Sequence, residues 1–213
     1  MSDRSMTPSP ATQPDTRTRI LDAAARLFHE QGFNATGVST ILREAGINPG
    51  SLYNLFPSKD ALLASVLERY TELLFPVVMA PVEGKTNDPI ERVFALLQQY
   101  RDWFLPLEFR LGCPIGNLAL EVADSHPEIR PLIQQNFDGW CGFVEKWLRE
   151  AGDRLPRDLD RKQLAATVLT VMEGGLMQAR SSRSAAAYDA SVSQLRQYFD
   201  LLLVRASAER SKS

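Results

Sequence analysis

The stretch between residues 32 and 59 constrains this chain most, because it marks the boundaries of two short helices joined by a tight turn. Thr36 stands at an N-cap position, and apolar residues recur at helical spacing over residues 38–45. Gly46 favours the left-handed conformation that ends a helix, and Asn48 offers a second N-cap directly after it. The pattern therefore predicts a helix-turn-helix.

The second predicted helix has one apolar side and one polar side. Pro49 falls at its first position, where a missing N–H costs nothing. The inward stripe consists of Leu52, Leu55 and Phe56, and the outward residues are Ser51, Tyr53 and Asn54. Pro57 ends this helix, and Ser58 caps a third one that begins at Lys59.

This motif resembles the DNA-binding domain of the TetR (tetracycline-repressor-like) family of transcriptional regulators over roughly residues 17–70. The resemblance lies in Gly32-Phe33-Asn34-Ala35-Thr36, Ile41, Ala45-Gly46-Ile47, Ser51-Leu52-Tyr53 and Phe56-Pro57-Ser58-Lys59. The chain departs from the common family pattern at Gly37, Leu55 and Ala61. The resemblance implies binding of double-stranded operator DNA, and the expected contact residues are Thr36, Ser39, Arg43, Asn48, Pro49, Gly50, Ser51, Tyr53, Asn54 and Lys59.

Composition narrows the class of protein without announcing a DNA binder. The formal net charge is −2, so DNA affinity must come from a few cations, hydroxyls and backbone amides placed against phosphate. No apolar run is long enough to span a membrane, and the chain begins without a signal-peptide pattern. With two cysteines that read as thiols, the expected location is the cytoplasm, with no membrane partner.

Helical periodicity runs through the whole chain and no strand pattern appears, so the predicted fold is all-α with about nine helices. Residues 1–14 read as a disordered arm, residues 15–60 as the helix-turn-helix domain, and residues 206–213 as a disordered tail. Residues 61–205 read as a helical domain for ligand binding and dimerisation. Within it, a long helix from Lys59 is expected to end at Pro76, with a loop over residues 76–89.

The helical domain is rich in aromatic residues, which indicates a cavity for a small apolar or aromatic ligand as the alternative to simple core packing. The expected lining is Phe75, Phe94, Trp103, Phe104, Cys113, Asn117, Phe137 and Trp140. The resemblance implies that a molecule bound between these helices swings the DNA-binding domains apart. The segment from Arg110 to Leu118 also resembles an efflux- and detoxification-associated branch of the family.

Cys113 stands where a helix begins, so free N–H groups and the helix dipole are expected to lower its pKa. The sequence therefore predicts a thiol that senses oxidants or electrophiles. The alternative is a small apolar wall residue, whose burial would raise the pKa and leave the thiol unreactive.

The resemblance implies that the last two predicted helices carry the dimer interface, and a two-fold operator needs a two-fold protein. Its residues are Val168, Met172, Gly174, Gly175, Leu195, Phe199 and Leu202. The Gly174-Gly175 pair would let two backbones approach closely across that seam. Packing within one chain is the alternative interpretation.

The sequence as a whole predicts a homodimeric, ligand-responsive repressor that releases a palindromic operator, either on binding a ligand or on modification of Cys113. It contains no catalytic motif, so an enzyme is not expected, and neither a metal nor a cofactor is implied. The rival hypothesis is a small helical ligand-binding or thiol-handling protein that does not bind DNA.

Overall fold

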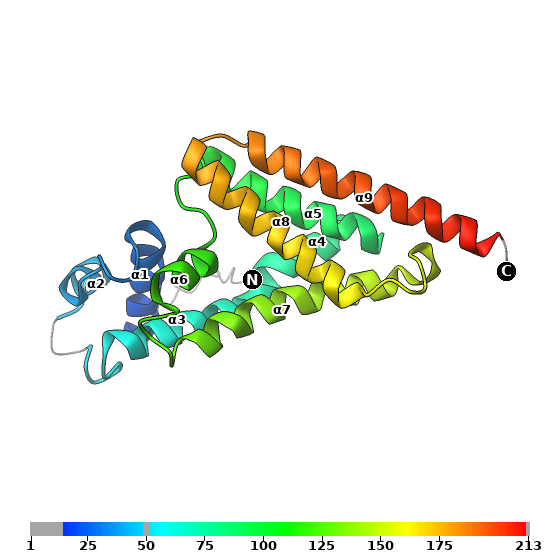
Figure 1. The fold of residues 1–213 in the computed structure, drawn as a ribbon. Helices are drawn as coiled ribbons and strands as arrows, with labels where there is room; N and C mark the ends of the chain where they lie inside the picture. Colours follow the sequence, from blue (N-terminus) through cyan, green and yellow to red (C-terminus); the bar gives the residue numbers. More distant parts are fainter. Residues whose placement is uncertain (1–14, 49–51, 212–213) are drawn as a thin grey trace, which may run out of the picture.

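The computed structural model describes residues 15–48 and 52–211, and these residues form helices and turns without a strand. The helices are α1 (Thr16–Gln31), α2 (Val38–Ala45), α3 (Lys59–Leu73), α4 (Ala80–Lys85), α5 (Pro89–Phe104), α6 (Pro114–Val122), α7 (Arg130–Glu150), α8 (Arg161–Ser182) and α9 (Ala186–Arg210). Helices α1 and α2 lie at one end of the molecule, and the C-terminal end of α9 lies at the other (Figure 1). The all-α prediction is confirmed.

Local signals place the first helices, with one correction at Thr36. Asp15 caps α1 by accepting from the Thr18 N–H, and Gly46 ends α2 with a φ of 65°. The N-cap of α2 is Gly37, which has no side chain to accept a bond, and Thr36 is instead buried. The Thr36 hydroxyl donates to the carbonyls of Leu27 and Gly32, so it fastens the turn between the helices and does not cap α2.

The second helix of the motif falls partly outside the described residues, because Pro49, Gly50 and Ser51 are among those that the structure does not describe. The described part, residues 52–55, forms a helical turn closed by a bond from the Phe56 N–H to the Leu52 carbonyl at 2.7 Å. Leu52 and Phe56 are buried as predicted, whereas Leu55 is 40% exposed and does not belong to the inward stripe.

Ser58 caps α3 by accepting from the Ala61 N–H, but this helix does not end in a loop at Pro76. A π-helical turn, Leu74–Met79, carries the chain through the proline into α4. A proline removes one backbone donor and clashes with the preceding turn, and the wider π turn accommodates that ring. Residues 76–85 are therefore helical, and only a short connection before α5 remains of the predicted loop.

The described residues pack into two hydrophobic cores. The first core joins α1, α2 and α3 to buried residues of α6 and α7, namely Leu118, Val122 and Ile133. The second core fills the space between α4, α5, α8, α9 and the rest of α7. In Figure 1, α6 lies between α1 and the larger bundle, so the helix-turn-helix is packed directly on two helices of the second half.

Helices α8 and α9 pack on each other within one chain, which overturns most of the predicted dimer interface. The residues buried inside the single chain are Val168, Met172, Gly175, Leu195, Phe199 and Leu202. A Cβ on Gly175 would lie 2.9 Å from Cδ2 of Tyr188, so the close backbone approach is between α8 and α9 of the same chain. Only Gly174 of the predicted set has open space beside it.

Helix α9 also extends farther than predicted. It runs to Arg210, and Arg205 in its last turns makes an ion pair with Asp158 at 2.6 Å. Most of the segment expected to be a disordered tail from residue 206 onward is thus helical. The predicted arm, residues 1–14, lies outside the described residues.

Candidate DNA-binding surface and ligand cavity

The predicted DNA contacts other than Lys59 fall into three groups. Ser39 and Arg43 on α2 are exposed, as are Asn48, Tyr53 and Asn54 in the segment that follows. Thr36 is buried with its hydroxyl turned inward, so the structure offers it no path to a phosphate. The predicted contacts Pro49, Gly50 and Ser51 lie outside the described residues.

Lys59, the first residue of α3, is half-buried. Its Nζ atom stands 4.1 Å from the centre of the Phe33 ring, a cation–π contact within the domain. Burial lowers the pKa of this lysine, and the charges of Glu121 and Asp60 act against that shift. Lys59 thus braces the α1–α2 turn, and a phosphate contact from it remains a prediction.

Sequence reasoning missed how Arg19 orders the motif. Its guanidinium donates to the carbonyls of Ala45 at 2.5 Å and of Gly46 at 3.2 Å. These carbonyls belong to the C-terminal end of α2, where the helix dipole is negative and backbone acceptors are free. A cation from α1 therefore fixes the turn that leads to the second helix of the motif.

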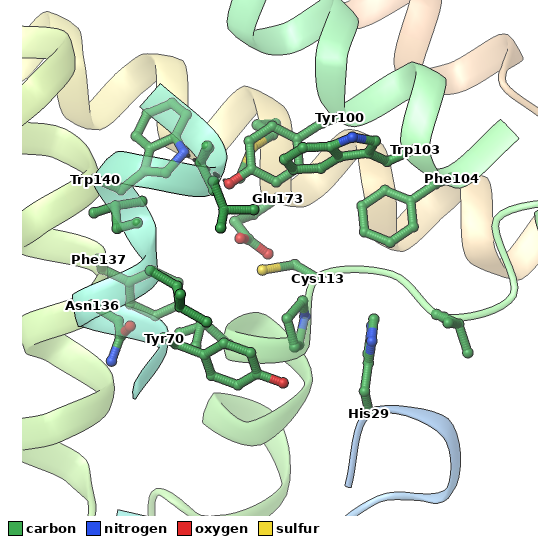
Figure 2. A pocket seen from close by; sticks show the side chains of 18 of the residues that line it. His29, Tyr70, Tyr100, Trp103, Phe104, Cys113, Asn136, Phe137, Trp140 and Glu173 are labelled. Atoms are coloured by element: carbon green, nitrogen blue, oxygen red, sulfur yellow. Dashed lines mark hydrogen bonds between the residues drawn. The ribbon is translucent and has the colours of Figure 1, made fainter. Parts of the chain in front are cut away.

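A cavity of about 450 Å³ opens between α3, α5, α6, α7 and α8 (Figure 2). Apolar and aromatic side chains form most of its wall, and the labelled aromatic residues are Tyr70, Tyr100, Trp103, Phe104, Phe137 and Trp140. The polar groups among its lining residues include His29, Cys113, Asn136 and Glu173. A volume of this size and an apolar wall with few polar groups are typical of small-molecule sites.

The structure brings five of the eight predicted pocket residues to this cavity: Trp103, Phe104, Cys113, Phe137 and Trp140. Phe75 points elsewhere, since it is 45% exposed and stacks on Phe143. Phe94 packs edge to face on Phe199 in the second core, away from this cavity. Asn117 lines a neighbouring groove, where its amide donates to the Leu111 carbonyl at 2.7 Å.

The environment of Cys113 reverses the prediction made for its pKa. The thiol is the N-cap of α6 and accepts a bond from the Gly116 N–H at 3.5 Å. Burial raises the pKa of Cys113 well above its ordinary value, and the nearby Glu173 carboxyl adds to that effect. Desolvation of the thiolate therefore outweighs the helix N-terminus, and Cys113 is a neutral thiol in the cavity wall.

Two contacts join the cavity region to the helix-turn-helix through α6. At its start, His29 of α1 lines the cavity, and its Nε2 lies 2.7 Å from the Gly112 carbonyl. Burial lowers the pKa of His29, so the neutral ring donates this bond through Nε2–H.

At the other end of α6, the Glu121 carboxylate accepts from the Phe33 N–H at 2.9 Å and the Asn34 N–H at 2.7 Å. Gly32 makes this possible, because its φ is 87° and a Cβ there would lie 3.0 Å from a Glu121 oxygen. One short helix thus holds the α1–α2 turn at one end and borders the cavity at the other.

The described part of the chain was found to hold neither a membrane-spanning helix nor a cluster of metal-ligating side chains. None of the helices in residues 15–48 and 52–211 is long and apolar enough to cross a membrane. Within the same residues, no group of three or more His, Cys, Asp or Glu side chains is arranged to hold a metal ion.

Comparison with known families agrees with this arrangement of a helix-turn-helix joined to a helical domain with a cavity. Residues 20–66 match the model of the bacterial regulatory proteins of the tetR family, and residues 89–195 match a tetracyclin repressor-like C-terminal domain. The chain belongs to the TetR family.

Individual relatives point the same way. The transcriptional regulators LmrA and YxaF of Bacillus subtilis are 32% and 31% identical to this chain. Each match covers 76% of this chain, with 85% of LmrA and 84% of YxaF. The repressor NemR of Escherichia coli is 26% identical over 81% of this chain and 88% of its own length. The crystal structure of reduced NemR superposes with a TM-score of 0.77 at 24% identity, covering 86% of this chain and 96% of that one.

This chain is therefore a transcriptional regulator with a DNA-binding helix-turn-helix, and it is not an enzyme. The rival hypothesis of a ligand-binding or thiol-handling protein without DNA binding is wrong.

Proposed function

We propose that this protein is a cytoplasmic, homodimeric repressor that holds a palindromic operator and leaves it when a small apolar or aromatic molecule occupies the cavity. The observation that carries the proposal is the double attachment of α6. Cys113 at its first turn borders the cavity, and Glu121 at its last turn holds the backbone of Phe33 and Asn34. A ligand that displaces α6 therefore acts on the helix-turn-helix.

The size of the effect follows from the linkage between the two sites. A ligand releases DNA only to the extent that it prefers the DNA-incompetent conformation. Coupling free energies between sites in one protein are typically about 1–3 kcal/mol, which corresponds to a loss of operator affinity of roughly 5- to 150-fold. Two charge-assisted backbone bonds at Glu121 are of the right order to transmit such a difference.

Homodimerisation is supported by apolar side chains left exposed on α8 and α9. Met177 on α8 is 58% exposed, and Leu201 and Val204 on α9 are each 68% exposed. Large apolar side chains exposed on two neighbouring helices are typical of a protein–protein interface. A second copy packed on these residues forms a four-helix bundle, and its two-fold axis matches a palindromic operator.

Modification of Cys113 is a second trigger of the same switch. The sulfur belongs to the cavity wall, so a reagent that enters the cavity reaches it, and the added group then occupies the space of a ligand. The raised pKa of Cys113 limits the thiolate fraction at neutral pH and makes this reaction slow. The geometry therefore favours reversible ligand binding as the principal trigger.

Selection of bound sequences from a random DNA pool tests the repressor proposal, followed by anisotropy measurements on the selected site. We expect the selected site to be a palindrome. The Tyr53 side chain is 63% exposed in the second part of the motif, so Tyr53→Ala should bind this site more weakly than the wild type. Leu105→Ala, which shortens an exposed apolar side chain after α5, is the control and should bind like the wild type. A pool without enrichment, or equal binding by wild type and Tyr53→Ala, contradicts the assignment.

A further inference from the structure

Glu173 is a half-buried acid that the proposed function does not use. It comes from α8 and points into the cavity, where it faces the thiol of Cys113 (Figure 2). Its Oε1 atom is buried and has no hydrogen-bond partner among the described residues. The Cys113 thiol bonds this carboxyl group but leaves Oε1 unpaired. Leaving a buried polar atom unpaired costs free energy, so an acid kept in this position calls for a partner that enters the cavity.

The charges around the cavity favour a positive partner. Glu173 is the carboxylate among the described lining residues, and these residues include neither a lysine nor an arginine. Arg180 lies in the neighbouring groove, where its guanidinium donates to Asn117 Oδ1 at 2.7 Å. His29 is neutral, because burial lowers its pKa. An anionic ligand would therefore find no cation in this wall, and it would meet a carboxyl group.

The remaining wall suits an organic cation. Tyr100, Trp103, Phe104 and Trp140 line the same cavity as Glu173, and aromatic faces attract ammonium groups. The Tyr100 hydroxyl accepts from the indole N–H of Trp140 at 3.2 Å, which satisfies the tryptophan without using Glu173. Burial raises the pKa of Glu173, and an ammonium group beside it would favour the ionised carboxylate again.

We propose that the cavity binds an aromatic or apolar amine, with its ammonium group paired to the Glu173 carboxylate and its ring between the aromatic side chains. This inference rests on the proposed function only in treating the cavity as the regulatory site. A cavity of about 450 Å³ has room for a ring system of two or three fused rings.

The test compares three probes of one shape by isothermal titration calorimetry at pH 7: 2-naphthylmethylamine, 2-naphthylmethanol and 2-naphthoate. For the wild type we expect the amine to bind at least about 10-fold more tightly than the alcohol, a difference of about 1.4 kcal/mol, and the carboxylate to bind weakest. Glu173→Gln keeps the shape of the side chain and removes its charge, so the amine and the alcohol should bind this variant equally. Glu128→Gln, which neutralises an exposed carboxylate after α6, should retain the wild-type preference.

Two results would overturn the inference: an alcohol that binds the wild type as tightly as the amine, or a preference for the amine that survives in Glu173→Gln. Circular dichroism of each variant checks that it is folded. The titrations contain no DNA, so their outcome is independent of the operator. Operator release by the alcohol but not by the amine would contradict the ligand class and leave the proposed function in place. Tight binding of the amine without any operator binding would support the ligand class and contradict the proposed function.

Discussion

The sharpest prediction concerns the two hydrogen bonds that the Glu121 carboxylate accepts from the α1–α2 turn. Glu121→Gln leaves an amide that accepts one backbone bond as a neutral group and turns an N–H₂ toward the second donor. Hydrogen bonds to charged groups contribute about 1.5–3 kcal/mol each. The two bonds here are 2.9 and 2.7 Å long, but Asn34 is exposed and its N–H regains water. The expected net loss is therefore about 2 kcal/mol.

Two assays measure that loss. Urea unfolding should show a free energy of unfolding lowered by about 2 kcal/mol, with Glu128→Gln as the charge-matched control. Because coupling between sites is itself about 1–3 kcal/mol, the ligand should still bind Glu121→Gln, but its effect on operator affinity should shrink by about 30-fold or vanish. Wild-type stability together with undiminished operator release in Glu121→Gln would refute the role of α6 as the link.

Two further predictions concern pH and assembly. Burial lowers the pKa of His29 from 6.5, so the folded protein binds fewer protons there than the unfolded chain, and stability should fall as the pH drops below that value. Urea unfolding across about pH 5 to 7.5 should show a flatter profile for His29→Gln than for His126→Gln, and equal slopes would contradict the assignment. Leu201→Asp places a charge on a residue that is 68% exposed and should dissociate the dimer in sedimentation measurements. Leu105 is exposed after α5, so Leu105→Asp should remain dimeric. An intact Leu201→Asp dimer would show that the interface lies elsewhere.

The parts of the fold that follow from adjacent residues could be predicted from the sequence. Ser58 caps α3, Gly46 ends α2, and α6 begins directly after Cys113, as predicted. Each of these features depends on a side chain or a φ value within a few residues, so the local sequence is enough to predict it. The aromatic content of the second half likewise indicated a cavity.

Features that depend on contacts between distant residues could not be predicted from the sequence. An apolar stripe on α8 does not say whether Val168 and Met172 face α9 of the same chain or a second chain, and both are buried internally. A proline inside a helical pattern predicts that the helix ends, yet the chain passes through Pro76 in a π-helical turn. Cys113 kept its predicted place at a helix start, but burial decides its pKa, and burial depends on α8.

The polar residues of the site carried the weakest sequence signal. Glu121, Glu173 and His29 stand alone in the sequence, without a motif around them. One available sign was Gly32, a glycine after α1 that leaves room for the Glu121 carboxylate. Another was Gly116, whose missing side chain makes room for Glu173.

Occupancy of the cavity and binding of DNA should oppose each other through α6. The most direct measurement is the dissociation constant of one cavity ligand, determined by calorimetry for the free dimer and for the dimer saturated with its selected operator. The ligand should bind the operator complex more weakly, by roughly 5- to 150-fold, and operator affinity should fall by the same factor when the ligand is present. Equal ligand affinity in the two forms would contradict this opposition.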